Sequence, residues 1–206
     1  MRYLFPLYHR RCLLLCLFLL LAGCTAKESD TPIPTPNPSP VATEKPSEPP
    51  PASPTDNGQA TASTKIFDRI PARTNNLKLA IAAIDGTILE VDETFSFNET
   101  VGDRTEEKGY QKAIGYDEHG EKQPTVGGGI CQISSTLYMA AKNGNFEIVE
   151  RHSHSHEVPY ADSDNDATVS YGGYDLKFKN TRDKPVKIEL STDEESVSAK
   201  ITELEK

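Results

Sequence analysis

The sequence predicts an α+β fold in which one central helix packs on an antiparallel sheet. Residues 131–143 place Ile133, Leu137 and Tyr138 on one face of a helix, and Gly144 follows the last turn. Several short segments with strand-like composition come after this helix, and no further helical pattern separates them. A helix followed by consecutive strands is typical of α+β proteins with antiparallel sheets.

A second helix is predicted before the central one. Asn75 and Asn76 are residues that cap helices well, and the apolar residues from Leu77 to Ile84 follow helical spacing. Gly86 is then expected to end this helix.

Strands are predicted on both sides of the central helix. Phe95 and Phe97 occupy alternate positions, which indicates a strand over residues 92–98. Residues 99–128 are polar and interrupted by glycines, and we expect them to form a long excursion that borders a site. After the central helix, the predicted strands are residues 146–152, 167–170, 175–179, 186–190 and 196–201, of which the last two form a hairpin.

Residues 1–23 are predicted to be a lipoprotein signal peptide. Basic residues precede an apolar run of ten residues (12–21), which is shorter than the roughly 20 that span a bilayer. The run ends in Leu21-Ala22-Gly23-Cys24, which resembles the bacterial lipobox. Cys24 would then become the lipidated N-terminus and attach the protein to the membrane. The alternative is an ordinary secretory signal with a chance cysteine.

Residues 24–64 are predicted to be the lipidated N-terminus and an unfolded tether. Ten of the fifteen prolines fall within residues 32–54, where they favour polyproline II and leave little apolar surface to bury. Such a segment is a spacer that holds a domain away from the membrane, although a proline-rich ligand for a receptor is the alternative.

Residues 65–206 have a length that suits one domain with one core. This part carries a formal charge of −9, and no basic patch or stripe is present, so nucleic acid is not an expected partner. Neither a Walker loop nor a dinucleotide fingerprint occurs, and we expect no cofactor.

Cys131 is the one cysteine outside the predicted signal peptide and lipobox. It stands at the start of the central helix, where unpaired N–H groups and the helix dipole lower the pKa of a thiol and favour the thiolate. Cys131 is therefore a candidate nucleophile, and the alternative is a small buried cysteine that fills the core.

The residues around Cys131 are candidates for an oxyanion or ligand loop. Three glycines before it permit close approach of a substrate backbone, and their N–H groups can form an anion-binding nest. The backbone N–H of Cys131 or Gln132 is the expected oxyanion donor. The predicted loop comprises Gly127, Gly128, Gly129, Gln132, Ser134 and Ser135.

A histidine cluster supplies the candidate base. His152, His154 and His156 alternate with serines, so on an extended strand all three rings face one side. His154 or His152 would pair with Cys131, and Asp166 would orient the imidazole. The order of cysteine, histidine and aspartate is similar to that of transglutaminase-like and papain-like hydrolases. Zinc held by three histidines is the competing chemistry.

Several blocks of the sequence, in one order, resemble the VanW family. The similarity covers roughly residues 70–190 and includes His154-Ser155. The longer blocks are VDETFSFN (91–98), VGDRT (101–105), EKGY (107–110), GGGICQISSTLY (127–138), EIVERH (147–152), DATV (166–169) and DLKFKN (175–180).

The resemblance implies an exported or membrane-anchored protein of a Gram-positive bacterium. The family pattern includes Cys131, Gln132, His152, His154 and Asp166, whereas His156 lies outside it. Val91-Asp92 stands where the family commonly has a Pro-Gly turn.

Three functions of different kinds remain open at this point. The first is a cysteine-dependent amidase, peptidase or transpeptidase that acts on peptidoglycan or another wall polymer outside the membrane. The second is a non-catalytic domain that binds the cell wall or serves as a scaffold. A zinc-binding domain is the third.

Overall fold

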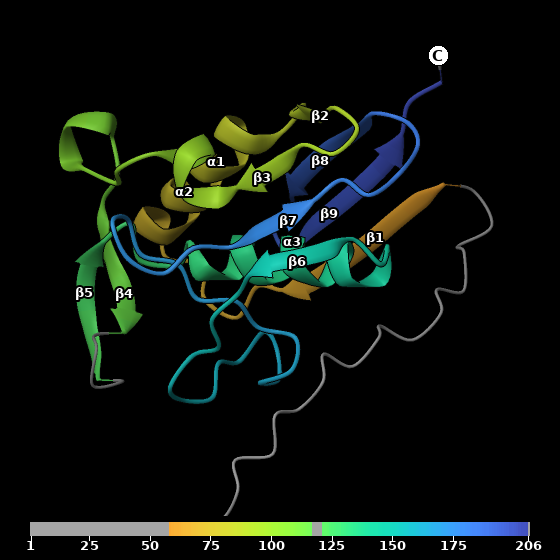
Figure 1. Cartoon of the computed structure of the whole chain (residues 1–206). Helices are drawn as coiled ribbons and strands as arrows, with labels where there is room; N and C mark the ends of the chain where they lie inside the picture. Colours follow the sequence, from red (N-terminus) through yellow and green to blue (C-terminus); the bar gives the residue numbers. More distant parts are fainter. Residues whose placement is uncertain (1–57, 117–120, 206) are drawn as a thin grey trace, which may run out of the picture. The chain divides into compact units, whose positions relative to one another are not determined.

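The protein is described by a computed structural model over residues 58–116 and 121–205 (Figure 1). The predicted signal peptide, Cys24 and most of the predicted tether lie outside the described residues. Within the described residues, no helix is long and apolar enough to cross a membrane.

The largest sheet has four antiparallel strands. Their order is β1 (Gln59–Lys65), β9 (Ser196–Glu203), β8 (Val186–Thr192) and β2 (Ile88–Leu89). The predicted hairpin is confirmed as β8 and β9, in which Ile188 pairs with Ile201 and both side chains are buried. Alternate residues of these strands therefore face the core, as the period of a strand requires.

The remaining named strands form two smaller sheets. The first has the order β3 (Thr94–Ser96), β7 (Lys177–Lys179) and β6 (Glu147–Glu150), and the second is the hairpin of β4 (Lys112–Tyr116) and β5 (Lys122–Val126). Phe95 of β3 lies opposite Phe178 of β7, and their ring centroids are 5.1 Å apart. This aromatic pair anchors the three-stranded sheet in the core.

The central helix α3 (Cys131–Asn143) has the bounds that the sequence predicted. It contacts β1 and β9 of the large sheet, as well as β6 of the three-stranded sheet (Figure 1). Ile133 and Leu137 are fully buried, and each such side chain contributes roughly 1.5–3 kcal/mol through burial. The predicted α+β class is confirmed. The comparison with papain-like hydrolases remains a prediction.

Helix α1 (Pro71–Ile84) begins one turn earlier than predicted. Pro71 occupies the first helical position, where its fixed φ is favourable. Asn76 is fully buried and does not cap the helix, because its amide nitrogen donates to the carbonyls of Gln111 (2.8 Å) and Gly128 (3.1 Å). The asparagine pair was therefore misread as a helix start.

Strand β1 lies within the segment predicted to be an unfolded tether. Ala60 and Thr64 are buried, and the strand pairs with β9 along its whole length. The folded part thus begins about six residues before Lys65. The inward positions carry only alanine and threonine, so the alternation of hydrophobicity along the strand is weak.

The predicted strand over residues 92–98 is shorter than expected. Phe97 begins the short helix α2 (Phe97–Val101), which Ser96 caps by accepting a hydrogen bond from the Glu99 N–H. Asp92 has a φ of 65°, so the turn before β3 keeps the left-handed conformation for which glycine is usual.

Between β6 and β7 the chain contains no named strand. The predicted strand over residues 146–152 ends at Glu150, and the histidine segment 151–156 and the predicted strand 167–170 are loops. Because β6 ends at Glu150, the histidine cluster does not share one face of a sheet. The loops are held by side-chain hydrogen bonds, and these determine the site described next.

Candidate functional site

Cys131 stands at the first position of α3 and is neither fully exposed nor fully buried. Its sulfur lies 3.7 Å from the carbonyl oxygen of Val169 and 3.8 Å from the hydroxyl of Thr168. Among the described residues, no carbonyl accepts the Cys131 backbone N–H, whereas the Gln132 N–H donates to Gly129 (3.0 Å). The Cys131 N–H is therefore the one that remains available to an oxyanion.

An open cleft of about 680 Å³ gives access to Cys131. The predicted excursion over residues 99–128 borders it through β4, as expected. The cleft is lined by Arg73, Ile114, Gly115, Tyr116, Gly129, Cys131, residues 151–156, Tyr160, residues 168–170 and Tyr174.

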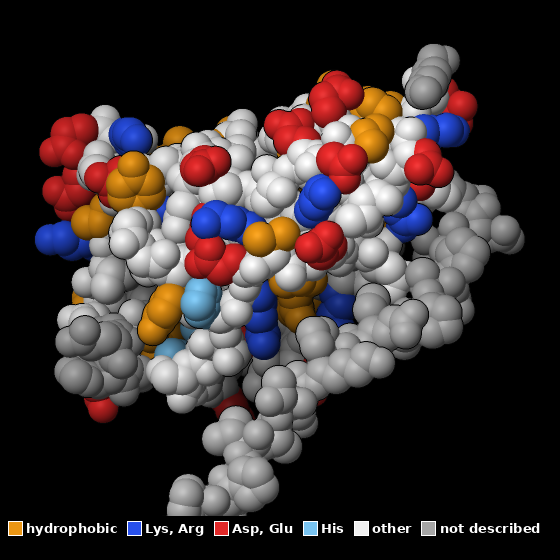
Figure 2. All heavy atoms as spheres, in the orientation of Figure 1, with side chains coloured by type: hydrophobic (Ala, Val, Ile, Leu, Met, Phe, Trp, Pro, Cys, Tyr) orange, Lys and Arg blue, Asp and Glu red, His pale blue; other side chains and the backbone are white. Residues whose placement is uncertain are grey.

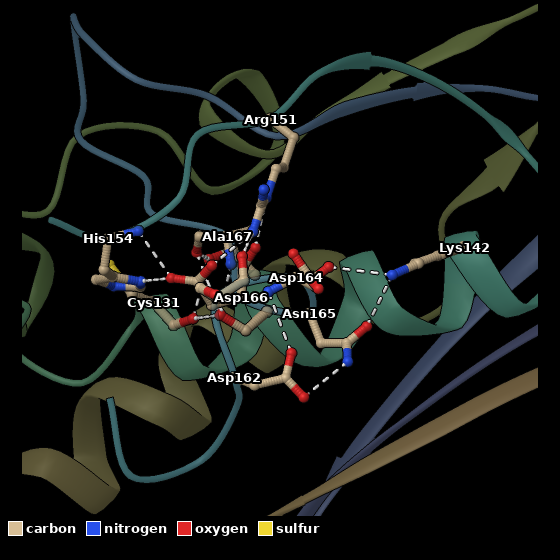
Figure 3. A network of polar contacts seen from close by, with 12 residues as sticks. Cys131, Lys142, Arg151, His154, Asp162, Asp164, Asn165, Asp166 and Ala167 are labelled. Carbon is tan, nitrogen blue, oxygen red and sulfur yellow. Dashed lines mark hydrogen bonds and ion pairs between the residues drawn. The ribbon is translucent and has the colours of Figure 1, made fainter. Parts of the chain in front are cut away.

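His154 is oriented by Asp166, as Figure 3 shows. The backbone N–H of His154 donates to Asp166 Oδ2 at 2.7 Å, and the Nδ1 atom of the ring contacts the same oxygen. The two side chains are only 5% and 2% exposed. Burial from water strengthens this charge-assisted contact and fixes the ring.

Asp166 is held in turn by Arg151. The Nη2 atom of Arg151 lies 2.6 Å from Asp166 Oδ1, and its Nε donates to the Asp166 carbonyl at 2.7 Å. The buried carboxylate is thus paired on both oxygens, which holds it in place.

The Cys131 thiol and the His154 imidazole form a coupled pair, and the sulfur lies behind the ring in Figure 3. Burial alone would raise the pKa of the Cys131 thiol, but the hydrogen bond and charge of His154 lower it below its usual value. Burial likewise opposes the charge on His154, yet Cys131 and then Asp166 raise the pKa of the imidazole. Both shifts favour a thiolate beside an imidazolium.

Tyr160 lines the same cleft, and no sequence pattern distinguishes it as a site residue. Its hydroxyl lies 3.5 Å from His154 Nε2, while the other ring nitrogen faces Asp166. Burial, together with the negative charge of Cys131, raises the pKa of Tyr160 well above its usual value. Tyr160 therefore stays protonated and can donate a hydrogen bond. A single tyrosine in a turn-rich segment carries no periodic signal.

All three histidines line the cleft, and the ring centroids of His154 and His156 are 5.7 Å apart, but the other two histidines have partners that differ from those of His154. His152 Nε2 lies 3.1 Å from Glu150 Oε1, and its ring stacks on Tyr174 at 4.4 Å. His156 stacks on Tyr116 at 3.7 Å. Within the described chain, no group of three His, Cys, Asp or Glu residues could hold a metal ion. The three-histidine zinc hypothesis thus loses its geometric basis.

Two N–H groups of the glycine loop are bonded to backbone carbonyls and are therefore not available to the predicted anion nest. The Gly127 N–H donates to Gln111, and the Gly128 N–H donates to Thr125. A Cβ on Gly128 would lie 2.2 Å from the Ala113 carbonyl oxygen, so only glycine fits against β4 there. These glycines place the start of α3 beside the β4–β5 hairpin.

Gln132, Ser134 and Ser135 turn inward, which differs from their predicted place in a ligand loop. The Ser134 hydroxyl donates to the Ala167 carbonyl at 2.6 Å, and the Ser135 hydroxyl accepts from the Ala167 N–H at 2.9 Å. These hydrogen bonds hold Ala167, the residue after Asp166, against α3. The two serines are fully buried and act as positioning residues.

A cysteine at a helix start, a buried histidine and a buried aspartate define the class: an α+β domain with a thiol–imidazole–carboxylate site. The VanW family model, described as VanW like protein, matches residues 72–202. The chain therefore belongs to the VanW family.

Two curated relatives share this similarity. The chain is 46% identical over 117 residues to YoaR of Bacillus subtilis, which is described as an uncharacterized protein. The alignment covers 57% of this chain and 38% of YoaR. It is 31% identical over 131 residues to the vancomycin B-type resistance protein VanW of Enterococcus faecalis. This second alignment covers 61% of this chain and 47% of that protein. The alignment thus spans less than half of each relative's length. No solved structure matches the chain.

Proposed function

We propose that this protein is a cysteine-dependent hydrolase or acyl transferase, anchored to the outer face of the cell membrane and acting on an amide of peptidoglycan. The observation that carries the proposal is His154, which lies between the Cys131 thiol and the buried Asp166 carboxylate. Sequence features outside the described residues, namely the lipobox and the proline-rich spacer, support an extracytoplasmic wall polymer as the substrate.

The proposed reaction proceeds in two steps. The Cys131 thiolate attacks the amide carbonyl, and the oxyanion accepts hydrogen bonds from the Cys131 N–H and the Tyr160 hydroxyl. The C–N bond then breaks, and the leaving amine takes the proton of the His154 imidazolium, which leaves a thioester. Water or a second amine next attacks the thioester and gives a proton to His154, so that the thiolate is regenerated.

The experiment measures two quantities in the unmodified protein and in three variants. These are the labelling by a fluorescent iodoacetamide and the turnover of purified peptidoglycan. We expect Cys131→Ala to abolish both, because Cys131 is the one free cysteine of the described residues. His154→Gln should lower both by about 100-fold or more, since imidazole catalysis contributes roughly 10²–10⁴-fold. His152→Gln is the matched control, because this histidine pairs with Glu150 instead, and it should retain both activities.

The proposal fails if Cys131 in native protein resists the reagent and reacts readily only after unfolding. Saturable binding to peptidoglycan that survives Cys131→Ser, with no bond cleaved by the unmodified protein, would instead establish the non-catalytic wall-binding function.

A further inference from the structure

Arg73 brings a positive charge into the cleft from a distant part of the chain. It lies in the first turn of α1, yet it lines the same cleft as Cys131 and Tyr160. Its side chain lies against Gly129, where an added Cβ would be only 2.8 Å from Arg73 Nη1. The absence of a side chain at Gly129 therefore makes room for the guanidinium two residues before the nucleophile.

The guanidinium is held in one orientation by Gln132. Arg73 Nη2 donates to Gln132 Oε1 at 2.8 Å. The Gln132 amide nitrogen donates to the Thr64 hydroxyl (3.1 Å) and the Lys65 carbonyl (3.0 Å), so its oxygen must point at Arg73. Gln132 is only 1% exposed, and a buried amide with all of these partners is rigid.

Among the residues that the structure describes, the charge of Arg73 has no carboxylate partner. Across residues 58–116 and 121–205, no aspartate or glutamate forms an ion pair with it, in contrast to Arg151 and its partner Asp166. Its Nε is shielded from water and has no hydrogen-bond acceptor. Its charge also opposes the rise in the pKa of Tyr160, which agrees with its place beside that hydroxyl. A partly desolvated donor without an acceptor is costly unless a ligand supplies one.

We infer that Arg73 is the anchor for a carboxylate of the substrate and that Gln132 positions it. The inference rests on the proposed function and narrows its substrate class to amides that carry a free carboxylate near the bond that is cleaved. A planar guanidinium suits this group because its parallel N–H donors match the two oxygens of a carboxylate. Neutral peptides would lack this contact and would bind less well.

The test compares alkylation of Cys131 by iodoacetate, which carries a carboxylate, with alkylation by neutral iodoacetamide. Arg73→Ala should slow the iodoacetate reaction by about tenfold, the order expected for a charge-assisted hydrogen bond, and leave the iodoacetamide rate within about twofold. Arg69→Ala removes the same charge from an exposed site four residues earlier and should change neither rate. An equal loss with both reagents would show that Arg73 only supports the fold, and it would overturn the inference.

A second measurement does not depend on a reactive thiol. In the Cys131→Ala variant, N-acetylglycine should raise the thermal midpoint of unfolding, whereas neutral N-acetylglycinamide at the same concentration should not. Adding Arg73→Ala should remove this stabilisation. If N-acetylglycine has no effect that depends on Arg73, the carboxylate site is disproved, whether or not Cys131 proves to be a nucleophile.

Discussion

Asp166 connects two side chains with different tasks. One of its oxygens accepts from His154 and the other pairs with Arg151, and both contacts are shielded from water. The histidine ring is thereby oriented so that its second nitrogen is left for the cleft. Among the three clustered histidines, His154 is the one that this buried carboxylate holds.

The pH dependence of Cys131 alkylation tests this arrangement. Since the thiol pKa lies below its usual value of 9.0, reactivity should appear as the pH rises through that lowered pKa, where the thiolate forms. In His154→Gln, burial still raises the thiol pKa and only the weaker contacts with Val169 and Thr168 still lower it, so the midpoint should move to a higher pH than in the unmodified protein. The pH–rate profile with iodoacetamide measures both midpoints. Identical profiles for the two proteins would show that the imidazole does not act on the sulfur.

Strand β1 is the element that the sequence assigned to the wrong region, and it also supports the site. Thr64 donates or accepts a hydrogen bond with Thr136 of α3 at 2.7 Å and accepts one from Gln132. The strand therefore links the large sheet to the first turns of the helix that carries Cys131.

Removal of β1 should destabilise the folded part. A chain that starts at Ile66 loses the whole strand, whereas one that starts at Gly58 keeps it. We expect the first to unfold about 10 °C lower, which corresponds to a few kcal/mol for a domain of this size. Thermal unfolding followed by circular dichroism measures the difference. Equal midpoints for the two chains would mean that β1 contributes nothing to stability.

At the scale of the whole molecule, charge and attachment are the features that matter. On the face drawn in Figure 2, acidic and basic side chains are interspersed, and no extended basic patch appears. This face offers no concentrated positive charge to attract anionic lipids. Attachment to a membrane through a lipid on Cys24, which lies outside the described residues, stays a prediction.

Cys24→Ser tests this attachment. We expect the unmodified protein to fractionate with membranes and to incorporate a radiolabelled fatty acid, and the variant to do neither, because the acyl chains supply the binding energy. Labelling of Cys131 should be the same in both proteins, because the substitution removes only the thiol that would be acylated. Membrane association that persists in Cys24→Ser would contradict the lipoprotein prediction.

Local patterns in the sequence were sufficient for the elements with a strong periodic signal. The bounds of α3 and the β8–β9 hairpin follow from side-chain spacing and glycine positions, because these signals depend on neighbouring residues. The same reasoning failed for β1 and for residues 151–156. In those segments small or polar residues alternate, and tertiary hydrogen bonds decide the conformation.

The sequence by itself determined the α+β class, the VanW family and the place of Cys131 at the start of a helix. Only the tertiary structure decided that His154 and not His152 is its neighbour, that Gln132 faces inward, and that Arg73 enters the cleft. The physical reason is that these contacts join residues far apart in the chain. Their geometry depends on where loops are fastened by buried hydrogen bonds, which no local spacing of residues records.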